Sequence, residues 1–260
     1  MAELVSQFGA AQTTGFVLAL ARVGPLFLFA PVFSSRAVPL RARLVVASAL
    51  ALALSQLALR GGRPPGDAVA LAALAAKELL VGLAFAFAVG VLFAAIQTAG
   101  AFLDAFTGFS YGAIVDPLTG NQNAVLAQLY ALLAAAIFLA IGGDAWLVGG
   151  LARTYTTLPL TATPAIGGIA EAAQTAFSGV FAAALEVAAP VVIALFVTDA
   201  AFALIARVAP QLNILQLGFA LKILVGLVVI GASLPFLAPW LGDRLAASLL
   251  DGIRGLVPNG

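Results

Sequence analysis

The side chains best placed to do chemistry in this sequence are charged residues that interrupt long apolar runs. Glu186 and Asp199 are acids, and Lys77 and Lys222 are bases, within stretches made mostly of Ala, Leu, Val and Phe. A charge at the centre of a bilayer costs at least about 2.5–3.5 kcal/mol, so such residues pair with one another or face a water-filled cavity. Pairing would give these charges a structural role, whereas a cavity would make them part of an ion or proton pathway.

The spacing of these charges favours pairing. Glu186 and Asp199 are 13 residues apart, too far to share one site on a straight helix. Lys77 stands beside Glu78 at the start of an apolar run, where its side chain can also extend to the membrane surface. We therefore predict charges that act between helices or subunits, with a transport pathway as the alternative: Arg22, Lys77, Glu78, Glu186, Asp199, Arg207 and Lys222.

Residues 108–123, GFSYGAIVDPLTGNQN, differ from everything around them. The stretch holds three Gly, one Pro, two Asn and one Asp, so it should be irregular backbone in the middle of an apolar chain. At membrane depth, irregular backbone persists only where protein or water satisfies its N–H and C=O groups. We therefore expect this central loop to be enclosed by protein or to line a cavity.

The bulky residues of the central loop suggest a steric role. Large side chains on glycine-rich backbone can close a pore by excluding water and move aside when it opens, although a loop packed on its own protein explains the pattern equally well. Asp116 has no acidic neighbour to complete a cation site, so with Pro117 it is better read as a turn. The predicted plug residues are Phe106, Phe109, Tyr111, Ile114, Val115, Asp116 and Pro117. The predicted hinges are Gly108, Gly112 and Gly120.

Composition sets the class of protein. The 260 residues are 63% hydrophobic and 9% charged, whereas a soluble domain is about 45–50% apolar and about 25% charged. The mean hydropathy of +1.13 agrees with an integral membrane protein. The chain has no Cys and no His, and no nucleophile, metal-binding or phosphate-binding motif, so we predict no catalytic site, no metal and no cofactor. A net charge of +1 gives no indication of nucleic-acid binding.

The apolar pattern predicts an all-α membrane protein with about six helical segments arranged as kinked hairpins. Pro25 and Pro31 should kink or break the first segment, and Pro235 and Pro239 should end the last. The second segment is short for a bilayer core about 30 Å thick. The segments are residues 14–33, 44–59, 69–96, 124–141, 172–205 and 214–234.

We predict one domain over residues 1–260. Its parts are an N-terminal hairpin (1–63), a central hairpin (64–145) with the loop 106–123, C-terminal hairpins (146–239) and an amphipathic tail (240–260). Residues 153–164 read as a polar loop. Basic residues divide four against five between the two sets of links, so the positive-inside rule assigns no orientation. A flat bundle of simple spans fits this chain poorly.

Several phrases, in order along the whole chain, carry a family resemblance. They include KELLVGLAFAF at residues 77–87, VDP at 115–117, GGDAWL at 142–147 and RVAPQLNILQLGFALKILVGL at 207–227. An earlier phrase is made of Ala30, Pro31, Val32, Ser34, Arg36, Ala37, Pro39 and Arg41. On these residues the chain resembles the flagellar biosynthetic FliR family, whose injectisome counterparts are called SctT.

The resemblance implies a subunit of the type III export gate in the bacterial inner membrane, at the flagellar basal body. It implies assembly with FliP-like and FliQ-like subunits, neighbouring FlhA-like and FlhB-like proteins, and unfolded proteins as the exported substrates. It also implies that the central loop plugs the channel, with Tyr111 and Ile114 where relatives often carry Phe. An injectisome subunit is the alternative, and a secondary transporter for ions or small solutes is a more distant one.

Overall fold

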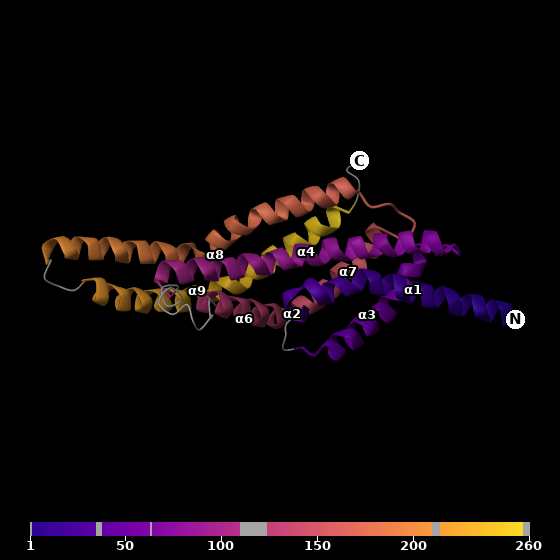
Figure 1. Ribbon diagram of the computed structural model, residues 1–260, viewed down its shortest axis with the longest axis horizontal. Coiled ribbons are helices and arrows are strands. Elements are labelled where there is room, and N and C mark those ends of the chain that lie inside the picture. The colour runs from indigo at the N-terminus through magenta and orange to yellow at the C-terminus, as the bar shows by residue number, and fades with distance from the viewer. Residues whose placement is uncertain (1, 35–37, 63, 110–123, 210–213, 257–260) are drawn as a thin grey trace. The chain divides into compact units, whose positions relative to one another are not determined.

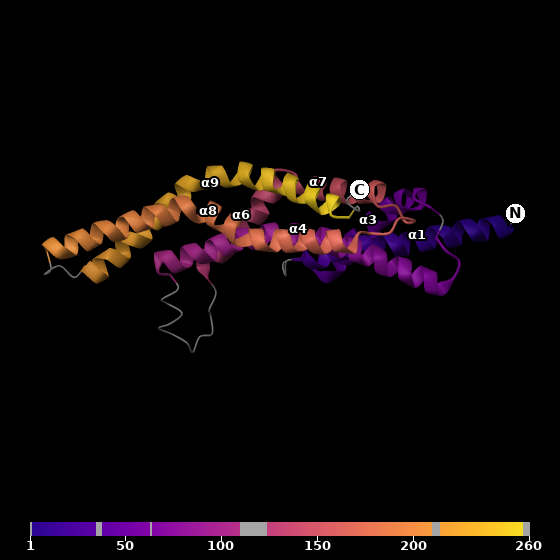
Figure 2. The ribbon, with the colours of Figure 1, turned by 90° about the horizontal axis from the view of Figure 1, so that it is seen from above.

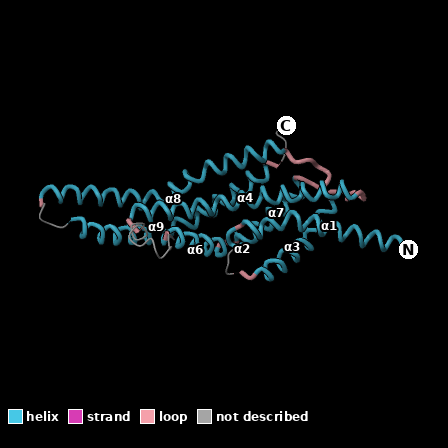
Figure 3. Tube along the Cα trace, viewed as in Figure 1, coloured by secondary structure: helices cyan, strands magenta, loops and turns pink. Residues whose placement is uncertain are grey.

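The structure is a computed structural model that describes residues 2–34, 38–62, 64–109, 124–209 and 214–256 (Figure 1). Every regular element in these ranges is a helix, and Figure 3 shows no strand among them. The predicted all-α class is therefore confirmed. The helices are α1 (Ala2–Phe29), α2 (Pro31–Ser34), α3 (Leu40–Arg60), α4 (Ala68–Thr107), α6 (Val125–Ala140), α7 (Gly143–Thr157), α8 (Ile166–Val208) and α9 (Ile214–Arg254).

Five of the described helices are long and apolar enough to cross a membrane, and α6 with α7 raises the number to six if that pair is one span. This agrees with the six predicted apolar segments. With 40, 43 and 41 residues, α4, α8 and α9 are each about 60 Å long at 1.5 Å per residue. That is about twice the thickness of a hydrocarbon core.

The structure corrects several predicted boundaries. The second segment is not short, because α3 has 21 residues. The predicted loop 153–164 is wrong at its start, since α7 continues to Thr157. Proline does not end the last segment, because Pro235 and Pro239 both lie inside α9. A proline removes one main-chain donor, and membrane helices tolerate that loss where neighbouring groups satisfy the freed carbonyl. The expected amphipathic tail is consequently the end of α9.

The chain forms two compact units. Unit 1 comprises Met1–Val91, Gly142–Phe177 and Arg244–Gly260, and unit 2 comprises Leu92–Ile141 and Ser178–Asp243. Three long helices, α4, α8 and α9, contribute residues to both units.

In unit 1, α1 packs along α3, and α1 also lies directly against α4. A Cβ atom added to Gly82 of α4 would collide with the main-chain carbonyl oxygen of Arg22, so glycine is required for this approach. Val81, Leu158 and Leu256 form a buried cluster that ties α4 to the α7–α8 link and to the residues after α9. The core of unit 1 is thus made by segments far apart in the sequence.

In unit 2, the C-terminal part of α8 and the N-terminal part of α9 lie side by side, as both Figure 1 and Figure 2 show. A Cβ atom at Gly218 of α9 would be 3.5 Å from the ring of Phe202 in α8, which is ordinary contact. Phe93 of α4 and Phe138 of α6 pack edge to face, with ring centroids 5.5 Å apart. The contact between Phe93 and Phe138 joins α4 and α6, the two helices on either side of the central loop.

Candidate functional site

The central loop starts at a glycine C-cap on α4. Gly108 has φ 92°, a left-handed conformation that costs glycine little, and its N–H donates to the carbonyl oxygen of Asp104 at 3.2 Å. The Thr107 hydroxyl donates to the carbonyl oxygen of Leu103 at 2.6 Å. Since α4 ends at Thr107, the irregular backbone begins at Gly108 and not at residue 106.

The other end of the loop is fixed by the same turn of α4. The Asp104 carboxylate accepts a hydrogen bond from the N–H of Leu126 at 3.1 Å and from that of Ala127 at 3.0 Å. These N–H groups belong to the first turn of α6, whose N-cap residue, Ala124, has no side-chain acceptor. Asp104 therefore caps α6 from another helix, where the helix dipole also favours a negative charge. The carboxylate is 1% exposed, so water competes little for these bonds.

A second glycine lets this cap form. A Cβ atom at Gly100 would be 2.6 Å from both the Cα of Ala127 and the carbonyl oxygen of Leu126. The backbones of α4 and α6 therefore touch one turn before Asp104, which brings its carboxylate within reach of the α6 N-terminus. We call Gly100, Asp104, Leu126 and Ala127 the loop clamp.

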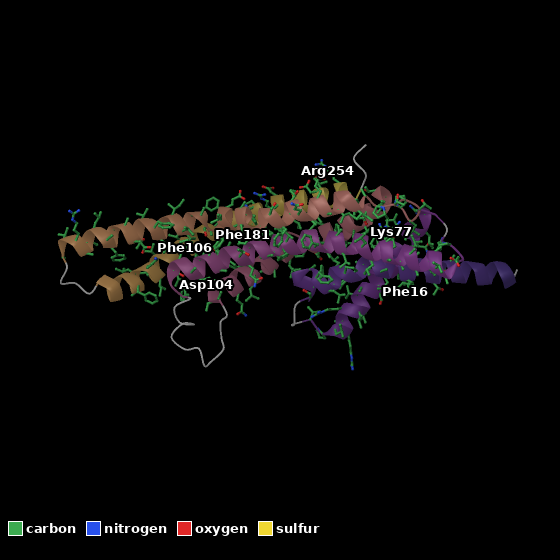
Figure 4. The ribbon with its side chains drawn as sticks, turned by 45° about the horizontal axis from the view of Figure 1, so that its top comes forward. Phe16, Lys77, Asp104, Phe106, Phe181 and Arg254 are labelled. Carbon is green, nitrogen blue, oxygen red and sulfur yellow. The ribbon has the colours of Figure 1, made fainter. Side chains whose placement is uncertain are left out.

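Aromatic packing also fixes the end of α4. Phe106 lies against Phe196 of α8, with ring centroids 5.5 Å apart, and Phe102 lies against Phe181 at 6.5 Å. Figure 4 labels Asp104 and Phe106 on α4 and Phe181 on α8. Phe106 thus anchors the base of the loop, and Phe109 is half-buried just beyond the helix. The remaining plug and hinge positions lie outside the described residues: Tyr111, Gly112, Ile114, Val115, Asp116, Pro117 and Gly120.

Unit 1 contains a buried ion pair between α1 and α4. Arg22 donates from Nε to one Glu78 oxygen at 2.6 Å and from Nη2 to the other at 2.9 Å, and both side chains are fully buried. Nη1 also donates to the Thr154 hydroxyl and Nη2 to the Leu158 carbonyl oxygen, each at 3.1 Å. The guanidinium carbon lies 4.0 Å from the ring centroid of Tyr155. A bidentate pair with these further partners is well suited to a site without water.

Lys77 reaches another segment of the chain, although its side chain could also have extended to the membrane surface. Its Nζ donates to the carbonyl oxygens of Pro159, Leu160 and Ala162 at 3.0, 2.7 and 3.1 Å. The Glu78 carboxylate is 3.3 Å away. Because the α7–α8 link turns here, its carbonyl groups converge on the ammonium group labelled in Figure 4. Lys77 therefore holds this link against α4.

The other predicted charges lie on α8 and α9. Lys222 donates to Asp199 at 2.7 Å, which joins the two helices of unit 2. Glu186 is exposed near the middle of α8, and Arg207 is exposed in its last turn. The structure therefore brings Asp199 to Lys222 but does not bring Glu186 to either. The described residues hold no group of three acids that could bind a metal ion.

The loop clamp is not among the predicted site residues. Asp104 has no local sequence pattern that identifies it, because it caps a helix that begins beyond the loop, with a bond to Leu126, 22 positions away. A usable indication was Ala124, which stands before a helix without a capping side chain. Gly82 and Gly100 likewise look like ordinary helix residues until the neighbouring backbone is placed.

Comparison with known proteins identifies the family. The profile of "Bacterial export proteins, family 1" matches residues 13–248. The chain is 34% identical over 221 residues to the flagellar biosynthetic protein FliR of Escherichia coli K12, covering 85% of this chain and 84% of the relative. It is 31% identical over 220 residues to FliR of Bacillus subtilis 168, covering 83% and 84%.

A third relative has a different name. The surface presentation of antigens protein SpaR of Shigella flexneri is 26% identical over 213 residues, which cover 80% of each chain. The family comprises membrane components of the type III export apparatus and no enzymes, which confirms the non-enzymatic prediction. From its motifs, its helices and these matches, the chain belongs to the bacterial export proteins, family 1.

Proposed function

We propose that this chain is a subunit of the flagellar type III export gate, and that its central loop closes the channel through which unfolded flagellar proteins leave the cell. In this proposal the chain assembles in the bacterial inner membrane, at the basal body, with FliP-like and FliQ-like subunits. FlhA-like and FlhB-like proteins complete the machinery. The embedded charges hold helices and subunits together rather than conduct ions.

The observation that carries the plug proposal is the loop clamp. Asp104 lies in the last turn of α4, just before the loop begins. Its buried carboxylate also caps α6, the helix that follows the loop, so one residue connects the two ends of the loop. A loop with both ends held can change conformation while the helices beside it stay intact. That is the mechanical requirement for a gate that opens for each substrate and closes again.

The side chains of the loop fit the same role. Phe109, Tyr111, Ile114 and Val115 present bulky, largely apolar surface over seven positions. Such side chains block a pore sterically and also make a water column unfavourable inside it. Gly108, with its positive φ, is a natural pivot at the start of the loop.

A flagellar system is favoured over an injectisome by the relatives. Five FliR proteins match at 26–34% identity, three of them at 30% or more, whereas three SpaR proteins match at 26%. A secondary transporter gains no support, since Asp199 is already paired with Lys222.

Complementation tests membership of the gate. The chain is expressed in a motile bacterium that lacks its own FliR, and swimming and the secretion of flagellar substrates are measured. We expect both to return, and we expect detergent-solubilised chain to co-purify with the host's FliP-like and FliQ-like proteins. A chain that is stably inserted but restores neither property and binds neither partner contradicts the proposal.

A further inference from the structure

A cavity of about 420 Å³ lies within unit 2, between α6, α8 and α9, and its size is typical of a binding pocket. Its wall is mostly apolar, with Val187, Val229 and Leu237 among the residues that line it. Phe236 also lines the cavity and is 74% exposed, so the cavity opens on the outer surface of unit 2. A molecule from outside the chain can therefore enter it, and we call it the unit 2 pocket.

The unit 2 pocket lies where both long helices carry proline. Pro190 of α8 lines it, and so do Leu234 and Phe236, which stand on either side of Pro235 in α9. Proline breaks the hydrogen-bond ladder of a helix and bends its axis, which interrupts the packing of α8 against α9 at this level. The pocket is consequently a feature that the sequence builds, near the middle of both helices.

The polar residues of the wall already interact within the chain. Tyr130 is hydrogen-bonded to Ser233, whose hydroxyl donates to the carbonyl oxygen of Ile230 at 2.8 Å. Glu186 and Trp240 also interact with other groups of the chain. These residues therefore give no reason to expect a polar occupant, and burying a polar group against the apolar wall would cost free energy.

Neither water nor one inserted side chain fills the unit 2 pocket. An apolar cavity of about 150 Å³ stays dry and is large enough for a benzene molecule. The pocket is more than twice as large, so a single side chain from a partner helix would leave much of it empty. Each empty part loses the dispersion contacts that the wall would otherwise make. A long, flexible apolar chain restores these contacts.

We propose that the unit 2 pocket binds an acyl chain of a membrane phospholipid. The surface around the pocket is one that a bilayer covers, because Leu185 and Val228 are 51% and 63% exposed and the apolar window of Gly218–Arg254 is only 17% buried. Acyl chains are the apolar chains that a bilayer brings to the mouth of the pocket. The assignment requires a membrane but no export gate, so it can fail or hold independently of the proposed function.

Trp240 lines the pocket and can report on its occupant. The chain has two tryptophans, so Trp146→Phe leaves Trp240 as the only one. The full-length variant is delipidated in detergent micelles, and phosphatidylcholine with brominated acyl chains, which quench tryptophan on contact, is added in steps. We expect the Trp240 fluorescence to fall to a plateau at one bound lipid per chain. Unbrominated phosphatidylcholine should reverse the quenching by competition.

Filling the pocket should abolish this quenching. Val229→Phe/Ala232→Phe places two rings in the wall of the pocket. The matched control, Val228→Phe/Gly231→Phe, moves the same rings one position back along α9, to exposed positions outside the pocket. We expect the first variant to lose the plateau and the control to keep it, with melting curves showing that both are folded. Val229→Phe alone should weaken the binding if the double variant does not fold.

Quenching that rises without a plateau, or that is equal in the filled variant and its control, overturns the proposal, because lipid would then only surround the chain. A partner helix is the other outcome. If brominated lipid does not quench Trp240, and its emission shifts to shorter wavelength only when FliP-like and FliQ-like subunits bind, the pocket belongs to a partner and the proposal is overturned.

Discussion

The side chain of Asp104 and the main-chain N–H of Leu126, 22 positions later in the chain, are joined by a hydrogen bond of 3.1 Å. A second bond from Ala127 to the same carboxylate makes Asp104 the cap of α6. The loop that interrupts the apolar sequence is thus closed at its base by a single buried acid. The two helices on either side of the unusual loop are therefore held together at its base.

Asp104→Ala should destabilise the chain by about 1–3 kcal/mol, because two buried N–H groups lose their acceptor and α6 loses its cap. Asp104→Asn, which keeps one acceptor oxygen, should cost less. Unfolding in mixed detergent micelles measures both values. Asp144, an exposed acid in the first turn of α7, provides the control. Equal stability of Asp104→Ala and wild type would show that the clamp contributes nothing.

Gly100→Ala should destabilise unit 2 by about 1–3 kcal/mol, because the new methyl group meets backbone rather than a movable side chain. Gly179→Ala is the matched control, since a Cβ atom there has nothing within 4 Å. Alanine at position 179 should be neutral or stabilise α8 by up to about 1 kcal/mol. The same unfolding assay compares them, and similar effects of the two substitutions would contradict the backbone contact between α4 and α6.

Gly108→Ala should cost about 1–2 kcal/mol, because φ 92° places a Cβ atom in strained contact with its own backbone. If Gly108 is the pivot of the loop, export should slow as well. Secretion of a flagellar substrate per cell measures this effect, with Gly179→Ala again as the control. If Gly108→Ala is destabilised but exports at the wild-type rate, Gly108 is not the pivot of the loop. Its role as the C-cap of α4 would still stand.

The helices were predictable from the sequence because their apolar runs are long and leave no alternative in a membrane. The positions of prolines misled the prediction at Pro235 and Pro239, since a rule drawn from water-exposed helices overstates the effect of one missing donor. The extent of α7 was missed for a different reason. Thr154 and Tyr155 look polar in sequence, but they are buried against Arg22, which lies 132 positions before Thr154.

The loop clamp could not be predicted, because the role of each of its residues depends on how α4 and α6 pack. Gly100 is a common residue in an apolar helix, and Asp104 is an ordinary polar residue near a loop. Only the approach of α6 to α4 gives the first a steric role and the second a capping role. The glycine that ends α4 was predictable, since Gly108 acts through its own backbone.

Removing one partner of the buried Arg22–Glu78 pair should destabilise the chain more than replacing both partners by apolar residues. Arg22→Met or Glu78→Met alone should destabilise by about 3–5 kcal/mol, because each leaves the other buried charge without its bidentate partner. The double variant Arg22→Met/Glu78→Met should be more stable than either single variant. A double-mutant cycle in the unfolding assay measures the coupling. Strictly additive losses would argue against a mutually dependent pair.

The most direct measurement of the plug proposal is the ionic conductance of the assembled gate. The chain is co-assembled with its FliP-like and FliQ-like partners in planar bilayers, with residues 109–122 intact or replaced by a short Gly-Ser link. The replacement leaves Asp104 and the first turn of α6 unchanged. We predict that the intact gate stays closed and that the replaced gate passes small ions continuously. A replaced gate that assembles fully and conducts no more than the intact one would contradict the proposal that the loop closes the channel.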